Sequence, residues 1–111
     1  MLIIKKTIRD EKGSYVESIF ESSNILKSLY FPDQERLYIS FGGGQTYSYG
    51  NIKQKMYENF EKAKSQGKYF IKEIKANPQE FPYKKEFSLF PGEIEEIKKI
   101  IEEKKKTVKD E

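Results

Sequence analysis

The chain has 111 residues, a length that fits one domain around one continuous hydrophobic core. Apolar residues make up only 36% of it, but eight Tyr and eight Phe supply the large buried area that a compact core needs. Cys and His are both absent, which excludes disulfides, Ser–His or Cys–His nucleophilic catalysis and the usual zinc sites. No segment has the length and apolarity of a membrane span or a signal peptide, so we expect a cytoplasmic protein.

The net charge of +3 is distributed unevenly along the chain. Residues 1–52 are neutral, residues 53–75 hold seven Lys against three Glu, and residues 76–111 hold eight Lys against nine acidic residues. The surplus of positive charge therefore falls in the middle third. Such a surplus is typical of a face that attracts anions, and a solvated helix surface explains it equally well.

Apolar alternation predicts three strands in the first third of the chain. Residues 2–8 and 15–20 form a hairpin around a polar turn at residues 9–13. Residues 25–31 form the third strand, and residues 32–35 end it as a turn. Strict alternation along this third strand puts Ile25, Leu29 and Phe31 on one side and Leu26 and Tyr30 on the other.

The clearest strand pair is formed by residues 37–41 and 46–49. The run of three glycines at residues 42–44 permits the positive φ of a tight reversal, which predicts a hairpin. A hairpin turn is favoured over a phosphate loop because the run lacks a Gly-Lys-Ser/Thr ending and precedes a strand where a phosphate loop needs a helix. Alternation then places Tyr47 and Tyr49 on the same side of the second strand.

Two helices follow this hairpin. The first spans residues 51–66, with Asn51 as its N-cap, Gln54 completing a capping box and Gly67 as its C-terminal glycine. A second, shorter helix at residues 69–76 turns Phe70 and Ile74 inward.

The remaining third is less regular. Residues 81–90 are expected to form an extended segment that packs onto the domain, and a last helix begins at residues 91–92. This helix carries a narrow apolar stripe that covers either this domain or a partner's: Ile94, Ile97, Ile100 and Ile101.

These elements predict the α+β class: an antiparallel sheet of about five strands in meander order, one helix packed on a face, a short second helix and a C-terminal helix. We expect one domain over residues 1–111. Asp33 and Glu35 are the nearest acidic group to a metal site, and a turn explains them better, so no metal is expected.

The paired tyrosines Tyr47 and Tyr49 leave two alternatives open. Rings on a strand are either part of the core or a platform on which nucleobases stack, and ring bodies can pack while their hydroxyls stay exposed. We take both as candidate ligand-binding residues, together with residues that offer a further ring or attract phosphate: Lys55, Lys62, Lys68, Tyr69, Lys72 and Lys75.

The middle of the chain, from about Ser22 to Tyr83, resembles the KTSC domain. This family is named for its occurrence at the C-terminus of some lysyl-tRNA synthetases and is also found as small stand-alone bacterial and phage proteins. The residues that carry the resemblance are Ser22-Ser23-Asn24-Ile25, Tyr30, the strand at residues 37–41, Tyr47-Ser48-Tyr49, Ile52, Tyr57, Ala63, Ser65, Gly67, Tyr69-Phe70 and Ile74. Lys53 and Lys64 depart from the pattern where Pro is usual, Ile71 where Asn is common and Lys75 where Arg is common.

The resemblance implies a KTSC-like region at residues 22–83 and leaves a C-terminal extension with an amphipathic helix at residues 84–111. KTSC domains have no assigned function, and the synthetase association suggests RNA binding. We therefore expect a binding module without catalytic residues or a cofactor, for nucleic acid (RNA) or another nucleotide-phosphate ligand. The alternative is a protein-interaction protein: a homodimer through the C-terminal helix, or a small phage-encoded inhibitor that sequesters a host protein or nucleotide signal.

Overall fold

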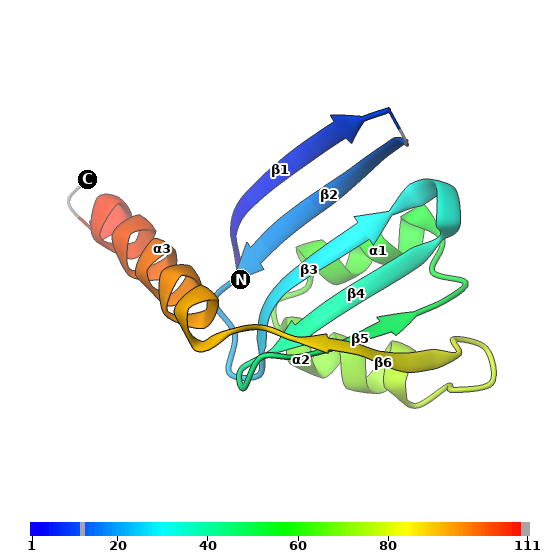
Figure 1. Cartoon of the computed structure of the whole chain (residues 1–111). Coiled ribbons are helices and arrows are strands. Elements are labelled where there is room, and N and C mark those ends of the chain that lie inside the picture. Colours follow the sequence, from blue (N-terminus) through cyan, green and yellow to red (C-terminus); the bar gives the residue numbers. More distant parts are fainter. Residues whose placement is uncertain (12, 110–111) are drawn as a thin grey trace.

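The computed structural model describes residues 1–11 and 13–109, and its described strands form one six-stranded antiparallel sheet in meander order (Figure 1). The strands are β1 (Leu2–Asp10), β2 (Gly13–Phe20), β3 (Ile25–Phe31), β4 (Arg36–Phe41), β5 (Gln45–Tyr49) and β6 (Tyr83–Ser88). The helices are the 3-10 helix η1 (Pro32–Gln34), α1 (Gln54–Lys62), α2 (Gln66–Tyr69), its continuation as the π-helix η2 (Phe70–Lys75), and α3 (Pro91–Lys109). The expected fold class is confirmed, with one strand more than predicted.

The sixth strand arises from the segment for which we predicted only an extended course. β6 pairs with β5, so that Tyr83 lies opposite Tyr49 and Lys85 opposite Tyr47. The predicted hairpins are confirmed as β1–β2 and β4–β5. Of the first predicted turn, Lys12 lies outside the described residues.

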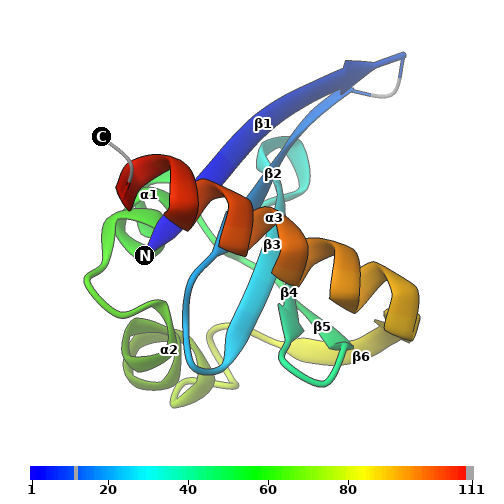
Figure 2. The ribbon, with the colours of Figure 1, turned by 90° about the vertical axis from the view of Figure 1, so that its left-hand side faces the viewer.

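Helices cover the two faces of the sheet unequally. α1, α2 and η2 lie on one face, which we call the inner face, and among the described elements only α3 lies on the other (Figures 1 and 2). α3 sits near one end of that second face, which leaves the rest of it, the open face, without a covering element (Figure 1).

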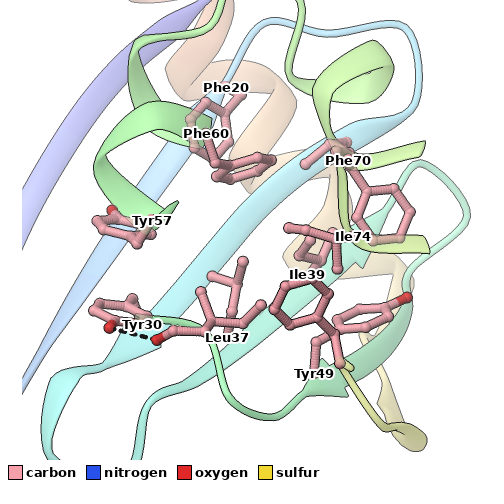
Figure 3. Packing of buried hydrophobic residues seen from close by; sticks show 12 residues of the cluster. Phe20, Tyr30, Leu37, Ile39, Tyr49, Tyr57, Phe60, Phe70 and Ile74 are labelled. Carbon is pink, nitrogen blue, oxygen red and sulfur yellow. Dashed lines mark hydrogen bonds between the residues drawn. The ribbon is translucent and has the colours of Figure 1, made fainter. Parts of the chain in front are cut away.

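The main core lies between the inner face and the helices (Figure 3). On the α1 side, the rings of Tyr30 and Tyr57 stack at 4.5 Å, and Phe60 meets Phe20 edge-on at 5.4 Å. The hydroxyl of Tyr30 donates a 2.7 Å hydrogen bond to the carbonyl of Ile52. These contacts fix α1 to the sheet through aromatic packing, as the tyrosine and phenylalanine content of the sequence required.

A second, smaller cluster lies under α3. Ile97 is buried there with Ile19, Leu26 and Leu89, and Ile94, Ile100 and Ile101 are partly buried against them. The apolar stripe that the sequence offered for a homodimer therefore packs within the chain.

The predicted sides of β3 are wrong because the pairing of β3 with β4 shifts register between Ile25 and Lys27. Ile25 and Tyr30 both belong to the main core, whereas Leu26 belongs to the cluster under α3. A bulge adds a residue to one strand, so residues beyond it change face relative to strict alternation.

The predicted caps of the first helix are also wrong. Asn51 has a left-handed backbone, with φ of 59°, and its side-chain amide donates to the carbonyl of Glu80 at 3.1 Å. α1 begins only at Gln54 and ends at Lys62, since Ala63 is extended. Gly67 lies inside α2, for which Ser65 is the N-cap. The first predicted helix is therefore shorter than expected at both ends, and the second, predicted at residues 69–76, begins earlier, at Gln66, and continues through η2 to Lys75.

Candidate functional site

A groove of about 730 Å³ opens on the inner face between η2 and the sheet. Its volume lies in the range of roughly 300–1,000 Å³ that is typical of small-ligand sites. Its sheet side is lined by Phe41 from β4, by Tyr47 and Tyr49 from β5 and by Tyr83 from β6. On the helical side, η2 contributes Ile71 and other residues, and π-helices occur often at functional sites.

The tyrosines of β5 have two roles at once. Tyr49 is 5% exposed and packs edge-on against Phe70 at 5.1 Å, which holds η2 on the sheet (Figure 3). Tyr47 is half-buried and meets Phe41 at 6.2 Å. Both rings also line the groove. Both tyrosines therefore contribute to the core and to the groove surface. Tyr49 is mainly a core residue, whereas Tyr47 is more exposed.

Tyr83 completes a cluster of three tyrosines. Its ring centroid lies 6.1 Å from that of Tyr49 and 6.3 Å from that of Tyr47, and its side chain is 59% exposed. None of the three hydroxyls makes a hydrogen bond to another described residue. These hydroxyls are therefore available to a ligand.

Burial is the main reason that the pKa of Tyr49 is raised to about 12, and the neighbouring Tyr47 and Tyr83 raise it further. A phenol with such a pKa stays protonated at physiological pH, so it can donate a hydrogen bond. Tyr49, which lines the groove, thus carries a neutral hydroxyl.

Charge around the groove has one sign. Lys75, at the end of η2, is the only lysine that lines it, and no acidic side chain does so among the described residues. Lys85 is exposed on the same face, opposite Tyr47. Asn24 and Ser23 add neutral polar groups to the lining. The groove is therefore suited to an anion, because it offers donors and a cation without a competing carboxylate.

The structure brings together three of the predicted site residues, Tyr47, Tyr49 and Lys75, and leaves the others outside the groove. Tyr69 is half-buried and packs against Phe60 at 6.3 Å. The other lysines are exposed on α1, α2 and η2 and do not line the groove: Lys55, Lys62, Lys68 and Lys72. The positive surplus of the middle third is thus spread over the helices.

Sequence reasoning missed Tyr83, Phe41 and Asn24 as site residues. A prediction of residues 83–88 as a strand paired with β5 would have placed Tyr83 opposite Tyr49, and so in the site. Asn24 had no such signal, since it reaches the groove from the loop before β3.

A separate polar cluster lies between α1 and the β1–β2 hairpin. The hydroxyls of Tyr57 and Ser18 share a 2.8 Å hydrogen bond, and Lys5 pairs with the buried Glu61 at 2.9 Å. Gln66 is fully buried, and its amide donates to backbone carbonyls that include that of Ala63, at 2.9 Å. This cluster joins the hairpin to the helices and has a structural role.

Over residues 1–11 and 13–109, no three acidic side chains gather as a group that could hold a metal ion. No helix in those ranges combines the length and apolarity needed to cross a membrane.

Comparison with known proteins bears on this arrangement. Residues 21–77, more than half of the chain, match the sequence profile of the KTSC domain. The chain belongs to the KTSC domain family. The crystal structure of a KTSC domain protein from Yersinia pestis matches it with a TM-score of 0.57 and 27% identity, covering 76% of this chain and 100% of that one. Among curated proteins, none matches the chain.

Most of the groove lies within the KTSC match. Tyr47, Tyr49, η2 and Lys75 fall inside residues 21–77, whereas Tyr83 falls outside them. The third tyrosine is thus supplied by a strand that the KTSC profile does not include.

Proposed function

We propose that this KTSC protein is a non-catalytic binding module whose groove takes nucleic acid (RNA) or another nucleotide-phosphate ligand. The observation that carries the proposal is the lining of the groove, which combines aromatic rings, phenol hydroxyls and Lys75 without any acidic side chain among the described residues. The association of some KTSC domains with lysyl-tRNA synthetases is a further reason to include RNA.

Both parts of a nucleotide have a complementary feature in this lining. A base can stack on the half-buried ring of Tyr47 or the exposed ring of Tyr83, and such stacking contributes about 1–3 kcal/mol per base. A phosphate can accept hydrogen bonds from the hydroxyls and from Lys75.

The non-catalytic part of the proposal rests on the side chains present. The sequence has no His or Cys, and the titratable groups that line the groove are tyrosines and one lysine. A general base near neutral pH needs a group that is deprotonated there, and burial holds the pKa of Tyr49 in the opposite direction.

Isothermal titration of the intact chain with a pool of short RNAs and with the four ribonucleoside monophosphates, at low salt, tests the proposal. We expect the native chain to bind at least one of these probes, and Lys75→Ala and Tyr47→Ala to bind it more weakly. Lys62→Ala is the matched control, because it removes a lysine that is also exposed but belongs to α1 and lies outside the groove. The absence of binding to every probe, or equal loss in Lys62→Ala and Lys75→Ala, would contradict it.

A second candidate function is self-association through the open face of the sheet, with a second copy of the chain as partner. The rings of Tyr15, Phe31 and Tyr38 form a row across β2, β3 and β4, with centroid distances of 4.9 and 5.4 Å. Aromatic residues of this kind are enriched in protein interfaces. Sedimentation equilibrium tests this: a dimer that Phe31→Ser dissociates supports it, and a monomer at all concentrations contradicts it.

A further inference from the structure

The three tyrosines of the groove form a compact set of hydrogen-bond donors. Alternation puts Tyr47 and Tyr49 on the inner face of β5, and the antiparallel register places Tyr83 directly opposite Tyr49. The ring centroid of Tyr83 lies 6.1 Å from that of Tyr49 and 6.3 Å from that of Tyr47, across the strand pair. Three phenols from two adjacent strands therefore serve one site.

The chemistry of this set favours an anion over a cation. A bound metal cation such as Mg²⁺ or Ca²⁺ needs several oxygen ligands, and no acidic side chain lines the groove among the described residues. Neutral hydroxyls donate well to phosphate oxygens, and burial keeps Tyr49 in its protonated form. Lys75 supplies the one positive charge of the lining.

The position of the remaining lysines limits how much negative charge the site can hold. Lys68 and Lys72 belong to the same helical segment as Lys75, and Lys85 lies on the same face opposite Tyr47, yet none of these three lines the groove. A polynucleotide track needs several cations along a continuous path. One lining lysine in a groove of about 730 Å³ matches a ligand of nucleotide size with one phosphate group.

We infer that the groove binds a free nucleotide, anchoring a single phosphate through the hydroxyls of Tyr47, Tyr49 and Tyr83 with Lys75 as counter-charge, in preference to a nucleic-acid chain. This inference rests on the proposed function and narrows its ligand class. It assigns a specific role to Tyr83, the residue outside the KTSC match.

Calorimetric titration of the intact chain with adenosine 5′-monophosphate, adenosine and a ten-nucleotide oligoadenylate RNA, each at several salt concentrations, tests the inference. The monophosphate is expected to bind roughly tenfold or more tightly than adenosine, because the phosphate makes the charged contacts. The slope of log K against log salt is expected to be no steeper than about −0.7, the value for one neutralised phosphate on a single strand, because a free monophosphate has no condensed counterions to release. The oligonucleotide is expected to bind no more tightly than the monophosphate.

Tyr83→Phe isolates the hydroxyl, since it keeps the ring of a side chain that is 59% exposed and should leave folding intact. We expect it to weaken the monophosphate roughly tenfold and adenosine hardly at all. Tyr69→Phe is the control, because Tyr69 lies outside the groove.

The outcomes separate the two proposals. Tight oligonucleotide binding with a slope of about −2 or steeper, which the monophosphate does not compete away, overturns the inference and leaves the proposed function standing. Equal losses for monophosphate and adenosine in Tyr83→Phe also overturn it. If none of the three probes binds, and none of the other ribonucleotides binds either, the proposed function itself is overturned.

Discussion

Tyr49 and Tyr83 lie directly opposite each other on β5 and β6, with their ring centroids 6.1 Å apart, although 34 positions separate them in the numbering. One ring is buried against Phe70 and the other is 59% exposed. The pair therefore connects the core that holds η2 in place with the surface that a ligand meets. A groove built in this way can be tested separately for stability and for binding.

The raised pKa of Tyr49 predicts a loss of stability at high pH. The unfolded chain releases this proton near pH 10 and the folded chain only near pH 12, so the contribution is complete below pH 10 and is lost as the pH rises to 12. We expect the free energy of unfolding to fall across this interval more in the native sequence than in Tyr49→Phe. Urea denaturation of both at pH 9 to 12 measures the difference. A difference in the free energy of unfolding between the two proteins that stays the same from pH 9 to 12 would contradict the prediction.

The hydrogen bond between Tyr57 and Ser18 predicts a second stability effect. Tyr57→Phe removes the hydroxyl and leaves the buried Ser18 without this partner, at a cost of about 1–3 kcal/mol in the free energy of unfolding. Tyr38→Phe, on the open face, should cost less than about 0.5 kcal/mol. Chemical denaturation compares the two variants. Similar losses in the two variants would show that the hydrogen bond between Tyr57 and Ser18 does not stabilise the fold.

Gly44 joins the β4–β5 turn to α3. It has φ of 93°, and an added Cβ would lie 2.9 Å from Cδ1 of Ile94 and 3.2 Å from the carbonyl oxygen of Leu89. Gly44→Ala should therefore destabilise the fold by about 1–3 kcal/mol. At Gly92 an added Cβ meets nothing within 4 Å, so Gly92→Ala should be neutral or stabilising by up to about 1 kcal/mol. Thermal unfolding of both checks the contrast, and equal effects would refute it.

The packing of Ile97 predicts how α3 contributes to stability. Its side chain is 7% exposed in the cluster with Ile19 and Leu26, so Ile97→Ala should cost about 2–4 kcal/mol. Because these contacts lie within the chain, the cost should not depend on protein concentration. Denaturation at two concentrations a hundredfold apart measures this. A cost that shrinks with dilution would instead place the stripe between two copies, because dilution would remove the partner from the native sequence.

Local patterns carried enough information for the fold class and for part of the site. Alternation in residues 46–49 put Tyr47 and Tyr49 on one face, and the glycine run predicted their hairpin. These predictions succeeded because they depend on neighbouring residues only. The sides of β3 failed because the register shift after Ile25 is set by pairing with β4.

The groove as a whole could not be predicted from local sequence patterns. Its lining joins Asn24, β5, η2 and Tyr83, which meet only through the sheet register and the packing of η2. Asn51 shows the same limit: its sequence context is typical of an N-cap, yet its contact with the carbonyl of Glu80 holds it in a left-handed conformation. Long-range contacts decided both cases.

The central claim is that the groove between η2 and the sheet is the ligand site, and methyl NMR tests it most directly. Isoleucine δ1-methyl signals are followed while adenosine 5′-monophosphate is added. Ile71 and Ile74 line the groove, whereas Ile97 belongs to α3, on the opposite face of the sheet (Figure 1). We expect saturable shifts of the Ile71 and Ile74 signals, with the Ile97 signal unchanged. Shifts centred on Ile97, or none at any concentration, would contradict it.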